Sequence, residues 1–210
     1  MAARDYGQYC GLTRAMELVG ERWALLIVRD LLVGPRRYGA LADGLPRIPS
    51  NILAARLKEL QEAGILYRVP RSRVIIYELT DYGRELEPIV RALGAWGFKA
   101  MGEPRAGQVV TPDSMTMAFR TAFRPQVAAN LPATVYEAHV GPAVLLLKVD
   151  GADLAVSRGS GPSDLAFAAG PGIRQLISGE LSPARAIKTG VVELLQGPSA
   201  LLERFAQTFH

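Results

Sequence analysis

The sequence has very few of the residues on which most catalytic and metal sites depend. It contains one cysteine, Cys10, and two histidines, His139 and His210. A single cysteine cannot form an internal disulfide, which is typical of proteins from a reducing compartment. The sequence contains no HExxH, CxxC or nucleophile-elbow motif. We therefore expect no bound metal, no cofactor and no enzymatic activity.

The sequence also lacks a long uncharged apolar run. Its most apolar stretch, residues 23–33, carries Arg29 and Asp30. It is shorter than the ~20 residues that a helix needs to cross a bilayer. The first ten residues are polar and charged, unlike a secretory signal. We therefore expect a cytoplasmic protein without a membrane segment.

Apolar residues make up 49 % of the 210-residue chain, which is enough for one large or two small folded domains. Charge is distributed unevenly. Residues 1–105 contain 16 lysines and arginines against 12 acidic residues, whereas residues 106–210 contain 8 of each. The whole net charge of +4 therefore lies in the first half, which favours a polyanionic partner for that half.

The first half is organised around residues 50–64, with the sequence SNILAARLKELQEAG. A helix over residues 51–63 has one apolar face and one small, polar face. The apolar face is formed by Leu53, Leu57 and Leu60. We expect Ser50 to cap the start of this helix and Gly64 to end it. One face would pack, and the other would be free to contact a rigid surface.

Two stretches rich in β-branched and aromatic residues follow this helix. Residues 65–69 and 74–79 predict a β-hairpin, and Arg71 and Arg73 give its tip a positive charge. This order of elements, with a helix followed by a strand, a basic turn and a second strand, is typical of a winged helix-turn-helix. The alternative is an ordinary small α+β domain with no role in nucleic-acid binding.

Three further helices are predicted ahead of residue 50. They cover residues 13–19, 23–33 and 36–43, and Arg36 and Arg37 open the last of them. A short turn containing glycine connects the third of these helices to the helix that begins after Ser50. This arrangement matches the helix-turn-helix pattern.

Residues 80–100 predict a helix with an apolar stripe, capped by Thr80 and kinked or restarted at Pro88. Such a stripe can complete the domain's own core or pack against the same helix of a second copy. We favour the dimer, because the small domain already has a buried helix and a packed helix at residues 50–64. The proposed dimerisation residues are Leu86, Ile89, Val90, Leu93 and Trp96.

The second half begins after a stretch rich in glycine and proline at residues 102–112, which we interpret as a linker. It predicts a helix at 114–123 and a β-hairpin formed by 134–140 and 143–149. A third strand at 153–157 is then followed by helices at 163–169, 173–178, 183–188 and 198–207.

An ordered set of motifs in residues 9–97 resembles the HxlR-type family of bacterial transcriptional regulators. These motifs are Cys10, AMELVGERW (15–23), GPRRY (34–38), IPS (48–50) with Leu53, RLKEL (56–60) with Gly64, and YELT (77–80) with Gly83. The resemblance implies a homodimeric winged helix-turn-helix that binds double-stranded operator DNA.

From about residue 115 the chain resembles the sterol carrier protein type 2 superfamily. The resemblance is carried by SGELSPARAIKTG (178–190), by Gly197-Pro198, and by Leu201-Leu202. It implies an α/β domain with an apolar cavity for a hydrophobic or lipid-like molecule. The residues expected to line that cavity are Phe119, Phe123, Leu145, Leu147, Leu165, Leu176, Ile177, Leu181, Ile187 and Phe205. The alternative for each of them is plain core.

The DNA-binding roles follow from side-chain chemistry. Asparagine can pair with adenine, alanine can contact a thymine methyl group, and lysine can reach guanine or phosphate. Arginines at a wing tip or a helix start would contact phosphates, which position a protein without specifying sequence. The alternative is an ordinary solvated surface. The expected DNA-binding residues are Arg36, Arg37, Ser50, Asn51, Ala54, Ala55, Lys58, Arg71 and Arg73.

Cys10 is a candidate redox sensor, because some relatives use a cysteine near the N-terminus to respond to electrophiles or oxidants. Reactivity requires an exposed thiol with a lowered pKa, and Arg14, one helical turn later, would assist. The alternative is a small apolar residue at a dimer seam.

Together these patterns predict two domains. Residues 1–104 would form an α+β winged helix-turn-helix domain for DNA binding and dimerisation, and residues 112–210 an α/β sterol-carrier-like domain. The predicted function is a DNA-binding transcriptional regulator, active as a homodimer and controlled by a hydrophobic effector. The alternative function is a lipid carrier or partner-binding protein that uses the winged helix for protein contacts.

Overall fold

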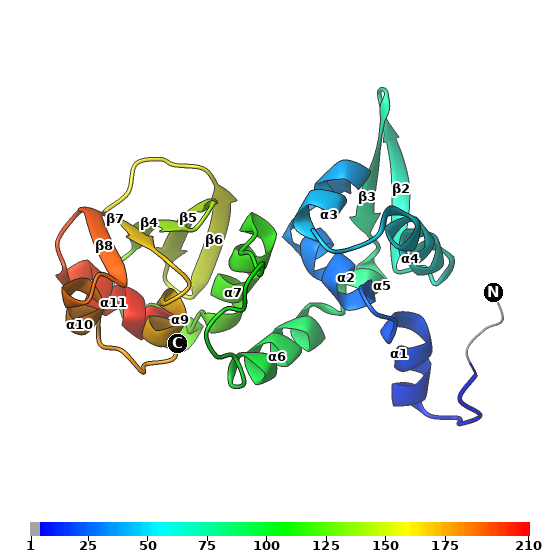
Figure 1. Cartoon of the computed structure of the whole chain (residues 1–210), viewed down its shortest axis with the longest axis horizontal. Helices are drawn as coiled ribbons and strands as arrows, with labels where there is room; N and C mark the ends of the chain where they lie inside the picture. Colours follow the sequence, from blue (N-terminus) through cyan, green and yellow to red (C-terminus); the bar gives the residue numbers. More distant parts are fainter. Residues whose placement is uncertain (1–4) are drawn as a thin grey trace. The chain divides into compact units, whose positions relative to one another are not determined.

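The computed structural model describes residues 5–210 (Figure 1). The chain forms two compact units, Met1–Ala92 and Leu93–His210, each with its own hydrophobic core. The boundary between these units falls inside one helix, α6 (Glu87–Phe98). The domain limits of 1–104 and 112–210 remain predictions from the sequence.

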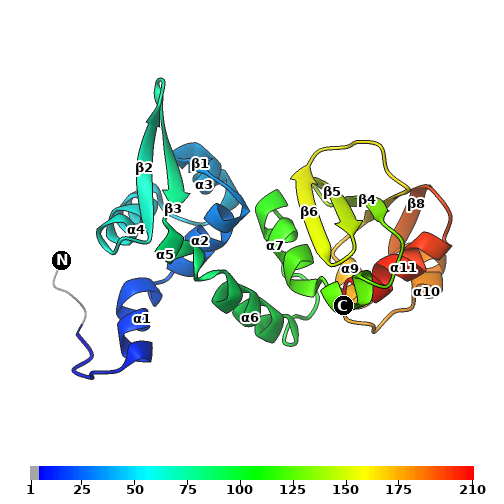
Figure 2. The same ribbon diagram turned by 180° about the vertical axis from the view of Figure 1, so that it is seen from behind.

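The first unit is a winged helix-turn-helix. Its elements in order are α1 (Gly11–Val19), α2 (Ala24–Val33), β1 (Arg36–Arg37), α3 (Tyr38–Gly44), α4 (Ser50–Glu62), β2 (Leu66–Arg71), β3 (Val74–Leu79), α5 (Asp81–Arg84) and the start of α6. The three strands form an antiparallel sheet in the order β1-β3-β2. The β2–β3 hairpin extends beyond α3 and α4 in both views (Figures 1 and 2). This hairpin is the wing.

The predicted apolar face of α4 is confirmed. Leu53, Leu57 and Leu60 are at most 2 % exposed. They belong to a core that α2, α3 and the base of the wing complete with Ile27, Val28, Leu31, Leu41, Ile65, Leu66 and Leu79. Each leucine buried in this way stabilises the unit by roughly 1.5–3 kcal/mol. The core therefore fixes which face of α4 is outward.

Two predictions about local structure in this unit are wrong. Ser50 is the first residue of α4 rather than its cap, because the extended backbone at Pro49 occupies the capping position. Arg36 and Arg37 do not open a helix. They pair with Tyr77 and Ile76 of β3 as the short strand β1, because pairing with the wing outweighs local helix propensity.

The predicted restart near Pro88 is confirmed. Thr80 caps α5, with its hydroxyl accepting from the Gly83 amide at 3.0 Å. The chain then leaves the helix at Glu85 and re-enters α6 at Glu87, so that Pro88 lies in the first turn, where a missing amide costs little.

The second unit is built on a five-stranded mixed sheet in the order β6-β5-β4-β7-β8. The strands are β4 (Thr134–Val140), β5 (Ala143–Asp150), β6 (Asp153–Arg158), β7 (Leu165–Ala169) and β8 (Val192–Gln196). β4 and β7 run parallel, and the other neighbouring strands run antiparallel. The helices of this unit are α7 (Pro112–Ala122), α8 (Pro125–Ala128), α9 (Ile173–Ile177), α10 (Pro183–Lys188) and α11 (Ala200–Thr208).

An aromatic cluster fills the centre of this unit. The rings of Phe119, Tyr136, Phe167, Phe205 and Phe209 are each fully buried. Neighbouring ring centroids lie 4.7–6.2 Å apart, mostly edge to face. Alternate strand residues and the helices contribute to this one core, so the helices cover one face of the sheet.

The sequence prediction missed two strands here. Residues 163–169 were expected to form a helix, but Leu165–Ala169 is strand β7, and β8 was not predicted. The alanines of β7 favour a helix locally, whereas Leu165 and Phe167 point into the aromatic core only if the segment is extended beside β4. Tertiary packing decides the outcome.

Candidate nucleic-acid interface

The outward face of α4 is small and polar, as expected. Ser50, Asn51 and Ala54 are exposed, and Ala55 is half-buried. Lys58 is 77 % exposed at its side chain and lies 3.6 Å from Glu62, a weak surface pair that another anion can replace. A helix face with this composition allows close approach of a duplex groove.

Two polar contacts hold α4 in place from outside the core. The Arg56 side chain, 9 % exposed, donates to Glu21 at 3.2 Å and to Glu59 of its own helix. The Tyr38 hydroxyl donates to the Ser50 carbonyl oxygen at 2.7 Å. The first turn of α4 is therefore tied to α3, and its middle is tied to the turn between α1 and α2.

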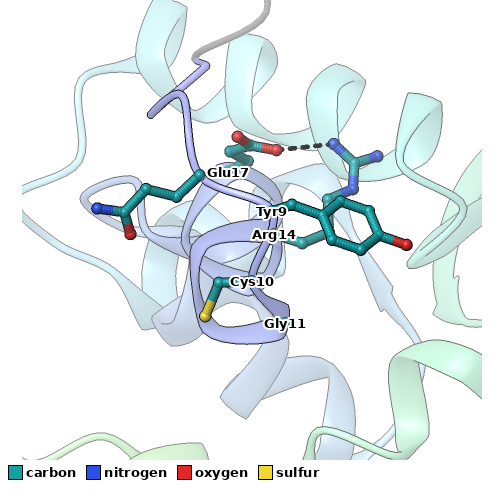
Figure 3. A pocket seen from close by; sticks show the side chains of 6 residues that line it. Tyr9, Cys10, Gly11, Arg14 and Glu17 are labelled. Atoms are coloured by element: carbon teal, nitrogen blue, oxygen red, sulfur yellow. Dashed lines mark hydrogen bonds and ion pairs between the residues drawn. The ribbon is translucent and has the colours of Figure 1, made fainter.

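Cys10 lies directly before α1, at the rim of a surface pocket of about 440 Å³ (Figure 3). The thiol is exposed, and hydrogen bonds from the backbone amides of Thr13 and Leu12 lower the pKa of Cys10. Arg14 has a different role from the one expected, because it pairs with Glu17 at 3.0 Å. The start of α1, and not Arg14, therefore favours the thiolate.

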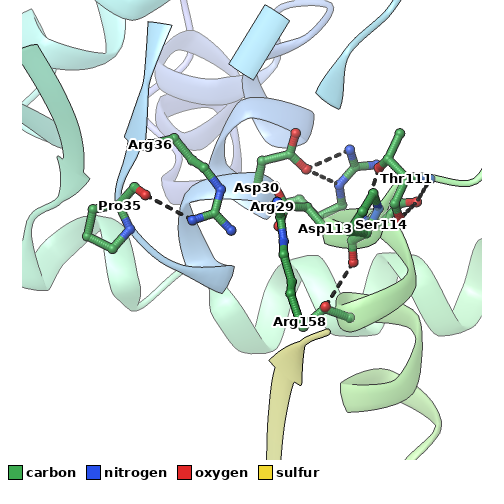
Figure 4. A network of polar contacts seen from close by, with 10 residues as sticks. Arg29, Asp30, Pro35, Arg36, Thr111, Asp113, Ser114 and Arg158 are labelled. Atoms are coloured by element: carbon green, nitrogen blue, oxygen red, sulfur yellow. Dashed lines mark hydrogen bonds and ion pairs between the residues drawn. The ribbon is translucent and has the colours of Figure 1, made fainter. Parts of the chain in front are cut away.

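The basic residues of the three-stranded sheet differ in their surroundings. Arg71 Nη2 donates to Glu78 Oε1 at 3.0 Å, whereas Arg73 in the turn is exposed and has no ion pair within residues 5–210. Arg36 is half-buried and donates to the Pro35 carbonyl oxygen at 2.9 Å (Figure 4), while Arg37 is exposed. The three-stranded sheet that contains β1 and the wing therefore carries several exposed positive charges.

The apolar stripe of α6 is only partly used within the chain. Val90 is 9 % exposed and Leu86 is half-buried, but Ile89, Leu93 and Trp96 are 51 %, 47 % and 74 % exposed. A second exposed apolar group is formed by Leu12 and Met16 of α1 and by Tyr9, which precedes this helix. Apolar surface left open in this way is typical of protein–protein contact sites.

The candidate ligand-lining residues of the second unit lie in its packed core. All of them belong to the core or pack directly against it: Phe119, Phe123, Leu145, Leu147, Leu165, Leu176, Ile177, Leu181, Ile187 and Phe205. Their side chains contact one another, as expected for plain core residues, and their role in ligand binding stays a prediction.

No group of three or more His, Cys, Asp and Glu side chains within residues 5–210 is arranged to hold a metal ion. The helices found there are all too short or too polar to span a bilayer.

The sequence analysis also missed Glu78 and Tyr67. These residues face each other across the wing, and the Tyr67 hydroxyl donates to Glu78 Oε2 at 3.1 Å, which raises the pKa of Tyr67. The alternation of β2 and β3 places Tyr67, Arg71 and Glu78 on one face, so the register of the hairpin would have revealed them.

Comparison with known proteins gives one family model and several relatives that each match less than half of the chain. The model of the HxlR-like helix-turn-helix family matches residues 18–104. The uncharacterized HTH-type transcriptional regulator Rv3095 of Mycobacterium tuberculosis is 45 % identical over 94 residues, covering 43 % of this chain and 59 % of that protein. This chain therefore spans less than two thirds of that relative.

Two Bacillus subtilis relatives are covered more completely. The uncharacterized HTH-type transcriptional regulator YvaP is 37 % identical over 40 % of this chain and 80 % of its own length. The HTH-type transcriptional regulator YodB is 38 % identical over 39 % of this chain and 76 % of its own length. These relatives are transcriptional regulators, not enzymes. With its winged helix-turn-helix unit, the chain belongs to the HxlR-like helix-turn-helix family of transcriptional regulators.

Proposed function

We propose that the protein binds operator DNA as a homodimer, with α4 in the major groove and the wing against the phosphate backbone. The observation that carries this proposal is the two-sided character of α4. Its leucines are buried, while Asn51, Ala54 and Lys58 are exposed on a small polar face. Recognition helices of this fold present such a face to base edges.

The basic residues support the same proposal. Arg36 and Arg37 in β1 and Arg71 in β2 lie on one three-stranded sheet, and Arg73 lies in the turn that joins β2 to β3. Cations arranged in this way neutralise phosphates and set the register of a protein on the duplex. A cytoplasmic location follows from a DNA partner and is part of the proposal.

Dimerisation is supported by the exposed apolar side chains of α6. Two copies that meet through Ile89, Leu93 and Trp96 would form a self-complementary contact, which is the usual geometry of a twofold dimer. A symmetric dimer reads two half-sites about one helical turn apart, so we expect a palindromic operator.

The test uses selection from a random duplex pool, followed by footprinting. Asn51→Ala is expected to lose discrimination at one base pair, by about 1–3 kcal/mol if Asn51 pairs with adenine. Gln61→Ala is the matched control, because Gln61 is exposed at the far end of the same helix. An unchanged footprint and affinity for Asn51→Ala would contradict the proposed role of Asn51.

The sterol-carrier-like identity of residues 112–210 and its hydrophobic effector belong to the same proposal and rest on the sequence resemblance alone. Because the expected lining residues belong to the core or pack against it, an effector bound among them would displace some of their contacts with one another. Native mass spectrometry of the purified full chain tests this, and it should detect a bound apolar molecule. A ligand-free chain whose unfolding temperature does not respond to a lipid extract would contradict the effector.

Cys10 is proposed as a redox-responsive residue. Its exposure and its lowered pKa favour reaction of the thiolate with electrophiles. Mild diamide treatment should reduce operator binding by the wild-type chain but not by Cys10→Ser. Equal loss of binding in both proteins would contradict a role for Cys10.

A further inference from the structure

The outward face of the wing carries a three-residue polar cluster that the proposed DNA contacts do not explain. Glu78 on β3 accepts from the Tyr67 hydroxyl at 3.1 Å and from Arg71 Nη2 at 3.0 Å, both on β2. Tyr67 lies directly opposite Glu78, and Arg71 lies four residues further along the same face. One carboxylate therefore takes both donors.

The position of Arg71 along the hairpin makes this contact informative. In the antiparallel register, Arg71 faces Val74 next to the turn, whereas Glu78 lies nearer the base of the wing. The Arg71 side chain must therefore run back along the wing face instead of projecting beyond the tip. The Glu78 side chain is only 11 % exposed, while that of Arg71 is 65 % exposed and open to competing anions.

The two arginines of the tip are consequently not equivalent. Arg73 is exposed without an ion pair within the described part of the chain, so it can contact a phosphate without first leaving a carboxylate. Arg71 can do so only by leaving the Glu78 carboxylate, which offers it the same negative charge as a phosphate through one hydrogen bond.

We propose that Glu78 is a positioning and specificity residue, which holds Arg71 against the wing and withholds it from DNA until α4 is seated in its operator. This inference rests on the proposed DNA-binding function. On non-specific DNA, loosely placed phosphates compete poorly with Glu78. On the operator, α4 fixes one phosphate beside the wing, and Arg71 transfers to it.

The experiment measures the salt dependence of affinity on two duplexes, the selected operator and a scrambled sequence, between about 50 and 200 mM salt. Glu78→Gln keeps the size of the side chain and an acceptor for Tyr67, but removes the charge that holds Arg71. On scrambled DNA this variant should steepen the log-log slope by about 0.9, which is one additional phosphate contact. Its affinity there should rise by up to about fivefold, the upper limit for a surface ion pair. On the operator its slope should not change.

Arginine variants separate this mechanism from a general effect of charge. In the wild-type background on scrambled DNA, Arg73→Gln should make the slope shallower by about 0.9, while Arg71→Gln should leave it unchanged. The double variant Arg71→Gln/Glu78→Gln should behave on scrambled DNA like Arg71→Gln alone. A mere loss of repulsion between Glu78 and DNA would persist in the double variant and would overturn the proposal.

Two further results would also overturn it: an unchanged slope for Glu78→Gln on scrambled DNA, or a shallower slope for Arg71→Gln there. Failure of the underlying function looks different, since the wild-type chain would then bind neither duplex in a salt-dependent way. The unfolding temperature of each variant shows that the hairpin still folds.

Discussion

Trp96 offers the most direct test of the proposed dimer. Its side chain is 74 % exposed in the single chain, more than those of Ile89 and Leu93 on the same helix. A tryptophan buries about 150–250 Å² in a packed site, so about 110–185 Å² of Trp96 is still open to a partner. Complete burial of that area is worth about 3–5 kcal/mol at about 25 cal/mol per Å².

Association also loses translational, rotational and side-chain entropy, so only part of this free energy appears in the dissociation constant. Each twofold dimer contains two copies of Trp96, and Trp96→Ala removes both. We therefore expect a loss of at least about 2 kcal/mol, or about thirtyfold in the dissociation constant of the dimer. Trp96→Phe should recover much of this loss.

Sedimentation equilibrium over a range of protein concentrations measures this constant. The chain has two tryptophans, Trp23 and Trp96, and in a Trp23→Phe background a blue shift of the emission with concentration reports burial of Trp96. Leu195→Ala is the matched control, because Leu195 is 49 % exposed on β8, outside the proposed interface. If Trp96→Ala associates as tightly as the wild-type chain, Trp96 does not lie in the interface. A wild-type chain that stays monomeric refutes the dimer itself.

Three further predictions concern stability. Phe205→Ala should destabilise the second unit by about 3–5 kcal/mol, because its ring is fully buried among other aromatic rings, and denaturant unfolding measures this. Gly83→Ala should destabilise the first unit, because a Cβ at this position would lie 2.1 Å from the Ile65 carbonyl oxygen; an unchanged melting temperature would contradict this packing. Hydrogen bonds from His139 and from the Gly161 amide hold the pKa of Glu137 below its ordinary value of 4.5. Since folding lowers the pKa of Glu137, the contribution of this carboxylate to the free energy of unfolding is fully present above about pH 5. That contribution is lost as the pH falls through the pKa of Glu137 in the folded protein. Glu137→Gln should therefore flatten the acid limb of the stability profile.

The sequence predicted the first unit better than the second for physical reasons. The leucines of α4 repeat with a helical period, and the β-branched residues of the wing flank a basic turn, so local patterns and tertiary packing agree there. In β7 the local pattern and the tertiary packing disagree. Its alanines favour a helix, but the segment is extended beside β4, because Leu165 and Phe167 then pack in the aromatic core.

The residue types of the site were predicted from the sequence, but the ion pairs of its arginines were not. The exposed face of α4 follows from periodicity alone. The ion pair between Arg14 and Glu17 follows from the i,i+3 spacing of a helix, whereas the contact of Arg71 with Glu78 depends on the register of the hairpin and on the reach of the arginine side chain. Both contacts change the expected chemistry. An arginine that is already paired with a carboxylate binds a phosphate, or stabilises a thiolate, less readily than an unpaired arginine does.

The packing of the second unit decides how its proposed effector has to be sought. Phe205 and most of the other expected lining residues are fully buried core side chains, so truncating one of these removes several kcal/mol from a domain whose total stability is about 5–15 kcal/mol. Loss of regulation in such a variant would therefore report unfolding as readily as loss of a ligand contact. A ligand that binds only the folded unit raises its stability in proportion to the logarithm of ligand concentration. The informative experiment consequently leaves the sequence intact and varies the ligand.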